Sequence, residues 1–272
     1  MHIGGPLFAE EVQHTAKLDL NRALNNLIQP MQEQCVIGFQ KDMTACPEWT
    51  ELQPYPIIMQ IFARMSARVM VGEELCGDEW QQKSLQYISG FFSVIPALRK
   101  NYSPRFYWLA KYFNPEIKGV FKRRRAMAEF LAPTLEARND AFDAHIEGAE
   151  RPEDAIQWLI EEHRARGQKL TPDTLAQNIT ITMFASIHST SSIGLSTLFN
   201  LLDHSEYLVE IKEEISRAQQ KHLRNSPFWN RQALAELRVL DSVMRETLRV
   251  NSFTECMYSI PYFSAAFITT PR

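Results

Sequence analysis

The sequence predicts a mainly α-helical protein, and three features of its 272 residues support that prediction. Apolar residues recur at three- and four-residue spacings along most of the chain, as they do on one face of a helix. Glycine is scarce, and we take the 14 prolines to separate the periodic runs rather than to lie inside them. The sequence contains no alternating run of strand length and no internal repeat.

Eight helices are expected in order along the chain, and each is followed by turn-forming residues. Their approximate ranges are 8–40, 52–73, 79–100, 115–146, 153–166, 172–202, 205–221 and 233–250. The breaks between them include Cys46-Pro47, Gln53-Pro54-Tyr55-Pro56, Asn114-Pro115, Gly148 to Pro152 and Asn225-Ser226-Pro227.

The composition is that of an ordinary globular protein, with 45% apolar and 22% charged residues. A formal net charge of −3 gives no electrostatic reason to expect nucleic acid or an anionic membrane as a partner. The basic run from Lys122 to Arg125 is interpreted as a solvated helix face.

The four cysteines are far apart in the sequence and form no Cys-x-x-Cys pair, which argues against a zinc ribbon or a disulfide framework. No charged-then-apolar signal opens the chain and no membrane anchor precedes the helices. For the chain as given we therefore expect a reducing, cytoplasmic location.

One predicted helix is unusual because it has no charged side chain from Thr174 to Leu202. The preceding Thr171-Pro172-Asp173 is a favourable helix start, with a hydroxyl cap, a proline at the first position and an acid near the positive end of the dipole. A helix of this length without charges either spans a membrane or crosses a protein core. Roughly half its residues from Ile179 onward are Ser, Thr, Asn or His, too polar for lipid, so we expect a central core helix.

This uncharged helix has an apolar face and a hydroxyl-rich face. The apolar stripe comprises Phe184, Ile187, Leu195, Leu198 and Leu202. The hydroxyls away from it belong to Ser186, Ser189, Thr190, Ser196 and Thr197. Buried hydroxyls need hydrogen-bond partners. The pattern fits two interpretations equally: hydroxyls bonded back to helix carbonyls in a packed core, or hydroxyls facing a pocket that holds water or a ligand.

A second motif, Glu246-Thr247-Leu248-Arg249, lies near the end of the last predicted helix. Glu and Arg at positions i and i+3 share a helix face and can form an ion pair. Most such pairs are surface pairs that contribute little, so the motif alone carries little information. Its position after the uncharged helix, within the longer run Asp241 to Arg249, makes it informative.

These two segments together resemble the cytochrome P450 family. The run Asp241 to Arg249 resembles the family's K helix, in which the Glu and the Arg stabilise the haem-side core. The uncharged helix resembles the I helix, whose motif Ala/Gly-Gly-x-acid-Thr-Thr/Ser is matched in register by Ala185-Ser186-Ile187-His188-Ser189-Thr190-Ser191. A His at the acidic position resembles fungal members that serve secondary metabolism. The resemblance implies a partial cytochrome P450 fold, roughly helices C to K, over residues 1–255.

The resemblance also assigns roles to the motif residues. Ser189, at the family's threonine position, would hydrogen-bond the bound oxygen and pass protons to it, with Thr190 as the adjacent hydroxyl. His188, at the acidic position, would belong to the proton-delivery route, and a histidine can titrate near neutrality. Ala185 would belong to the cofactor-binding part of the helix.

Earlier segments agree with this assignment. The run Lys17 to Leu24 resembles the start of the C helix, where a basic side chain reaches a haem propionate. Lys17 is therefore the candidate for this contact. The resemblance also places Glu246 and Arg249 among the cofactor-binding residues. For a complete protein the family implies haem, a small apolar organic substrate, a flavoprotein reductase and the insertion of one oxygen atom of O2. Complete members are typically anchored in the endoplasmic reticulum membrane.

The family holds its haem iron with a cysteine thiolate, which lies in a Phe-x-x-Gly-x-x-x-Cys loop downstream of the K helix. No segment of the sequence matches this loop. Cys256 follows Arg249 by only seven positions and lacks the Gly-rich loop, so we assign no metal ligand. We expect the chain to be catalytically incomplete and marginally stable, with apolar faces of its I and K helices open to water.

Residues 256–272 do not resemble the family and are interpreted as a separate tail. A coding run that contains GTATGT, a common fungal intron donor, can encode Cys256-Met257-Tyr258, so a translated intron is one hypothesis for this tail. A non-catalytic helical interaction module without a cofactor is an alternative of a different functional class. A hydrolase or metal enzyme finds no support, because no His-Glu-x-x-His, Gly-x-Ser-x-Gly or phosphate-loop motif occurs.

Overall fold

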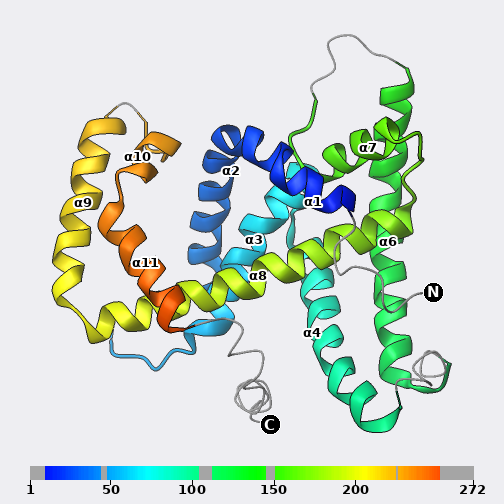
Figure 1. Cartoon of the computed structure of the whole chain (residues 1–272), viewed down its shortest axis with the longest axis horizontal. Coiled ribbons are helices and arrows are strands. Elements are labelled where there is room, and N and C mark those ends of the chain that lie inside the picture. The colour runs from blue at the N-terminus through cyan, green and yellow to red at the C-terminus, as the bar shows by residue number, and fades with distance from the viewer. Residues whose placement is uncertain (1–9, 44–47, 104–111, 145–150, 225, 252–272) are drawn as a thin grey trace. The chain divides into compact units, whose positions relative to one another are not determined.

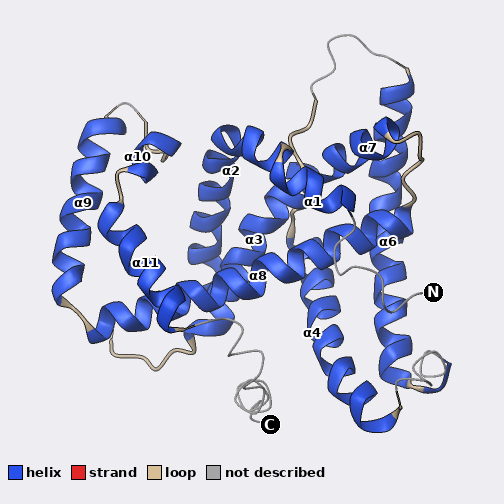
Figure 2. Ribbon diagram, viewed as in Figure 1, coloured by secondary structure: helices blue, strands red, loops and turns tan. Residues whose placement is uncertain are grey.

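The computed structural model describes residues 10–43, 48–103, 112–144, 151–224 and 226–251. Within these ranges the chain consists of helices and connecting loops, and no strand is present (Figures 1 and 2). The predicted fold class, mainly α, is therefore confirmed for the described part of the chain.

The helices follow the predicted order, with two subdivisions. They are α1 (Glu10–Lys17), α2 (Asp19–Asp42), α3 (Pro54–Leu75), α4 (Asp78–Asn101), α6 (Pro115–Asp143), α7 (Ala155–Ala165), α8 (Pro172–Asp203), α9 (Glu206–His222), α10 (Arg231–Ala235) and α11 (Arg238–Val250). The predicted helix 8–40 is divided between α1 and α2, and the predicted helix 233–250 between α10 and α11. A break of one or two residues leaves the apolar periodicity almost unchanged, so the pattern did not reveal it.

The expected placement of the prolines is wrong at three positions. Pro30 lies inside α2, Pro96 inside α4 and Pro133 inside α6. Proline removes one backbone hydrogen bond and crowds the carbonyl four residues earlier, but tertiary packing can keep the helix intact. A nearby side chain is buried in α2, at Leu27, and in α6, at Leu131, and such core packing favours an intact helix despite the local cost.

The chain divides into two compact units, and the division passes through α2, α3 and α8. Unit 1 comprises Met1–Cys35 and Ala63–Ser186, and unit 2 comprises Val36–Phe62 and Ile187–Arg272. Each unit is described separately below.

Unit 1 is a helical assembly in which α4 lies along α6, while α7 contacts both α1 and α6 (Figure 1). Its largest fully buried side chains are Val71, Trp80, Met127, Leu131, Leu135, Ile156, Ile160, Leu175, Ile179 and Met183, together with Leu27. Most of these are aliphatic side chains from α6, α7 and the first half of α8, with Trp80 from α4, so the core forms where these helices meet.

A buried ion pair links helices within unit 1. Arg138 on α6 donates to both carboxylate oxygens of Asp154, at 2.6 and 2.8 Å. Asp154 also caps α7, because its Oδ1 accepts the backbone N–H of Gln157 at 2.9 Å. On α3, Gly72 has a φ of 75°, and a Cβ at this position would collide with Oδ2 of Asp154. Glycine is therefore needed at position 72 for its backbone conformation and for the space that the carboxylate occupies.

Unit 2 contains α9, α10 and α11, with α9 in contact with both of the others (Figure 1). The face of α9 that packs inward carries Ile211, Glu214 and Ala218 at helical spacing. Large apolar side chains nevertheless remain exposed on the helices of this unit: Leu198, Phe199 and Leu202 on α8, and Met244, Leu248 and Val250 on α11. This agrees with the expected exposure of the two motif helices, while the expected low stability stays a prediction.

Candidate functional site

The uncharged helix predicted from the sequence is α8, a single helix of 32 residues. The hydroxyl of Thr171 accepts the backbone N–H of Thr174 at 3.2 Å, which confirms the predicted cap. Leu175 and Ile179 are buried in unit 1, and Ile187 is buried in unit 2, as expected of a core helix. Among the helices that the structure describes, none is both long and apolar enough to cross a bilayer.

The threonine hydroxyls of α8 follow the first of the two interpretations left open by the sequence, whereas the pocket of the second interpretation stays a prediction. Three threonine hydroxyls donate to the carbonyl four residues earlier, at 2.6, 2.7 and 2.8 Å: Thr180, Thr182 and Thr197. Ser186 instead bonds to Ser66 on α3, with 3.1 Å between the two hydroxyl oxygens, and both residues belong to unit 1. The fully buried hydroxyl of Ser191 has no hydrogen-bond partner within the described residues.

His188, at the acidic position of the motif, is 5% exposed and bonds to a tyrosine. Its Nδ1 lies 3.1 Å from the hydroxyl of Tyr55, and both residues belong to unit 2. Burial lowers the pKa of His188 to about 4, since the charged imidazolium is poorly solvated there. Burial also raises the pKa of Tyr55 to about 12. The expectation that this histidine titrates near neutrality is therefore wrong, and its imidazole is neutral at pH 7.

A role for Tyr55 is not indicated by the sequence pattern, because Tyr55 falls both in the expected helix 52–73 and in the turn-like segment Gln53-Pro54-Tyr55-Pro56 at its start. In the structure α3 begins at Pro54, so Tyr55 lies in the first helical turn, where proline is tolerated. Farther along α3, the helices α2 and α8 approach it closely within unit 2. A Cβ at Gly38 of α2 would lie 3.0 Å from Ile61, and one at Gly194 of α8 would lie 3.2 Å from Phe62.

The other I-helix candidates lie along α8 near His188. Ser189 is half-buried and Thr190 is exposed, both in unit 2. Ala185 is half-buried and belongs to unit 1. A half-buried hydroxyl and a buried neutral imidazole can each donate and accept a hydrogen bond. The specific roles assigned to these residues stay predictions.

The Glu246–Arg249 pair is present on α11 as a bidentate ion pair. Arg249 donates from Nε and Nη2 to the two carboxylate oxygens of Glu246, at 2.8 and 2.6 Å. Hydrogen bonding to the partner lowers the pKa of Glu246 and raises that of Arg249. The side chains are 59% and 71% exposed, so this pair lies on the surface of unit 2.

Two contacts that the sequence did not indicate hold α11 in place. The amide of Asn200 on α8 donates to the hydroxyl of Thr247 at 3.1 Å, so the two motif helices are joined within unit 2. The buried carboxylate of Glu214 on α9 accepts the backbone N–H groups of Val239 and Leu240, at 2.8 and 3.3 Å. Such contacts depend on residues far apart in the sequence, which a local pattern does not report.

Lys17 is the last residue of α1, is exposed, and belongs to unit 1. Its proposed contact with a haem propionate stays a prediction.

The described cysteines do not fit the thiolate ligand that the family's haem requires. Burial raises the pKa of both Cys35 and Cys76, which favours the neutral thiol. The thiol of Cys76 donates to the backbone carbonyl of Glu73 at 3.4 Å. Cys256 and the tail 256–272 lie outside the described residues. Within the described part of the chain, no group of three or more His, Cys, Asp or Glu side chains could hold a metal ion.

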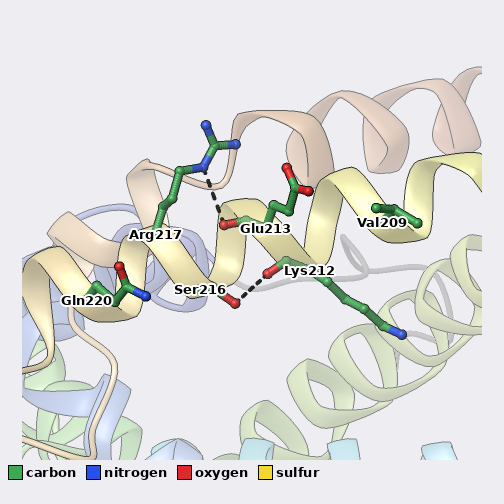
Figure 3. A pocket seen from close by; sticks show the side chains of 6 residues that line it. All are labelled: Val209, Lys212, Glu213, Ser216, Arg217 and Gln220. Atoms are coloured by element: carbon green, nitrogen blue, oxygen red, sulfur yellow. Dashed lines mark hydrogen bonds between the residues drawn. The ribbon is translucent and has the colours of Figure 1, made fainter.

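A shallow pocket runs along one face of α9, away from these motifs in the sequence (Figure 3). It is lined by Val209, Lys212, Glu213, Ser216, Arg217 and Gln220. All six residues come from the same helix, and Ser216 and Arg217 bond back to the carbonyls of Lys212 and Glu213, as Figure 3 shows. It is therefore the surface of a single helix rather than an enclosed site, and it contains none of the predicted site residues.

Comparison with known proteins identifies the family. The family model named Cytochrome P450 matches residues 13–258. The cytochrome P450 monooxygenase ccsG of Aspergillus clavatus is 31% identical over 247 residues, covering 90% of this chain and 48% of the relative. The cytochrome P450 monooxygenase CYP2 of Pyricularia oryzae is 35% identical over 209 residues, covering 74% of this chain and 43% of the relative. This chain thus spans about half the length of these curated relatives.

A solved structure supports the same fold. A retinoic acid-bound cyanobacterial CYP120A1 has a TM-score of 0.64 and 20% identity, with coverage of 88% of this chain and 48% of that one. At this level of identity the likeness concerns the fold, and it agrees with the partial fold predicted from the sequence.

Proposed function

Because this chain belongs to the cytochrome P450 family, we propose that it carries the oxygen-activating helix of a fungal monooxygenase but not the thiolate that holds the haem. The observation that carries the proposal is α8, where Ala185 to Ser191 match the I-helix motif within one uncharged helix. A polypeptide that combines these helices with the family's cysteine loop would oxidise a small apolar organic substrate in secondary metabolism.

Haem would supply the activation of O2 in such a polypeptide, with electrons from a flavoprotein reductase. One oxygen atom would enter the substrate, and the other would leave as water after uptake of two electrons and two protons. In this proposal Ser189 hydrogen-bonds the oxygen, Thr190 is the adjacent hydroxyl and His188 belongs to the proton route. Lys17, Ala185 and the Glu246–Arg249 pair are proposed to support the cofactor-binding core.

Two observations support the proposed absence of a thiolate from the 272 residues alone. No segment of the sequence matches Phe-x-x-Gly-x-x-x-Cys. The described cysteines, Cys35 and Cys76, have pKa values raised by burial. For the 272 residues alone we accordingly propose no oxygenase activity.

A chimera tests the role of α8 directly. Pro172–Asp203 would replace the aligned helix of the Aspergillus clavatus relative, and product formed per reductant consumed would be measured. General acid–base groups contribute about 10²- to 10⁴-fold, so we expect Ser189→Ala to lower this yield at least about tenfold. Ser196→Ala, which removes a neighbouring hydroxyl of the same helix, is the matched control and should leave the yield unchanged. Equal yields in the two variants would contradict the proposed role of Ser189.

A further inference from the structure

The contact between Tyr55 and His188 crosses from α3 to α8 within unit 2, at a position that the family motif reserves for an acid. The two side chains meet at 3.1 Å between the tyrosine hydroxyl and Nδ1. His188 is almost fully buried, and Tyr55 is half-buried in the first turn of α3. A neutral imidazole carries its hydrogen on one of two nitrogens, and the bond made by one nitrogen decides which.

The direction of this hydrogen bond follows from the chemistry of the two groups. A phenol hydroxyl is a more acidic donor than an imidazole N–H, and an unprotonated imidazole nitrogen is a stronger acceptor than a phenol oxygen. The arrangement in which the hydroxyl donates to Nδ1 is therefore the more stable one. Burial favours the neutral form of both groups, because it raises the pKa of Tyr55 to about 12 and lowers that of His188 to about 4.

We propose that Tyr55 is a positioning residue for His188: its hydroxyl donates to Nδ1 and holds the imidazole in the neutral tautomer with hydrogen on Nε2. His188 then carries its hydrogen on the buried Nε2 and is not a cation. This inference rests on the proposed function, because it describes the hydrogen-bonding state of the residue at the acidic position of the motif.

The packing around the contact explains why its geometry can be maintained. Gly38 and Gly194 allow α2 and α8 to approach Ile61 and Phe62 closely on α3. These close approaches lie six and seven residues after Tyr55 on the same helix, so α3 is packed against α2 and α8 near the contact. α8 itself carries no Asp, Glu, Lys or Arg between Asp173 and Asp203, so no charged group of that helix competes with the tyrosine for the imidazole.

Nitrogen-15 NMR of the 272-residue chain, labelled in its histidines, tests this inference at pH 7. The signals of His188 are identified by their loss in His188→Gln. We expect a one-bond nitrogen–hydrogen coupling at Nε2 and none at Nδ1. In Tyr55→Phe, which removes only the hydroxyl, we expect the Nδ1 resonance to shift because its donor is gone. Tyr87→Phe is the matched control, since Tyr87 bonds to Thr180 of α8, and it should leave His188 unchanged.

Either of two results would overturn the inference. A one-bond coupling at Nδ1 in the unmodified chain would show that the histidine donates to the tyrosine, whatever the variants do. An Nδ1 resonance that is the same in the unmodified chain and in Tyr55→Phe would show that the hydroxyl does not act on the ring. Neither measurement involves haem, oxygen or turnover, so failure here is distinguishable from failure of the proposed function.

Discussion

The amide of Asn200 on α8 donates a hydrogen bond to the hydroxyl of Thr247 on α11, at 3.1 Å. Thr247 lies inside the Glu-x-x-Arg motif and is 2% exposed, whereas Glu246 and Arg249 face solvent. In this chain the buried threonine, and not the ion pair, makes the contact between the two motif helices.

Replacing Thr247 by Val keeps the shape of the side chain but removes the acceptor for Asn200. We expect the free energy of unfolding to fall by about 1–2 kcal/mol, because the half-buried amide of Asn200 loses its partner. Chemical denaturation followed by circular dichroism measures this change. Ser242→Ala, which removes an exposed hydroxyl on the same helix, is the control. If both substitutions have the same small effect, the contact between the helices does not contribute to stability.

Glu214 replaces a local cap at the start of α11. The N-cap residue Leu237 has no side chain that can accept a hydrogen bond, and Glu214 accepts from Val239 and Leu240 instead. We expect Glu214→Ala to reduce the free energy of unfolding by about 1–2 kcal/mol, as loss of a cap does. The neighbouring exposed Glu213→Ala serves as the control. Denaturation midpoints that coincide for the two variants would rule out the cap.

The ion pair between Arg138 and Asp154 is buried, with side chains 12% and 2% exposed. Asp154→Asn retains an oxygen that can cap α7 but leaves the guanidinium without its counter-charge. We expect a loss of about 3–5 kcal/mol, typical when one partner of a buried pair is removed. The more exposed ion pair of Arg164 with Asp143 is the control, because Asp143→Asn should lower the free energy of unfolding only slightly. Thermal unfolding midpoints of the two variants test this, and equal midpoints would show that the buried pair contributes no more than the exposed one.

The buried imidazole of His188 makes stability depend on pH. Its pKa is lowered from 6.5 to about 4 in the folded chain, so the unfolded chain binds more protons between these values. Stability therefore rises with pH across this window: the contribution is present above about pH 6.5 and is lost as pH falls toward about 4. The full shift corresponds to about 3 kcal/mol.

Denaturant titrations at several pH values, on the unmodified chain and on His188→Gln, measure this contribution. We expect the slope of stability against pH between about 4 and 6.5 to be smaller in His188→Gln, because the titrating group is gone. The exposed His204→Gln should keep the slope of the unmodified chain. A slope that is identical in all three proteins would show that His188 does not titrate as described.

The order and type of the helices could be predicted from the sequence because they depend on local periodicity and on caps such as Thr171 at the start of α8. The resemblance to the family came from two short motifs and was confirmed by the match over residues 13–258. The partners of the motif residues could not be predicted. Tyr55 lies more than a hundred residues from His188 in the sequence, so a local pattern carries no information on their contact. The protonation state of His188 was predicted wrongly for a related reason, because its burial depends on residues that are distant in the sequence.

The reduced, carbon monoxide-bound absorption spectrum of the 272-residue chain with added haem tests whether a cysteine of this chain holds the iron. We expect no band at the position typical of a thiolate ligand, and at most the band of free or histidine-bound haem. A thiolate-type band that disappears in Cys256→Ser would contradict the account, because a cysteine of this chain would then hold the iron.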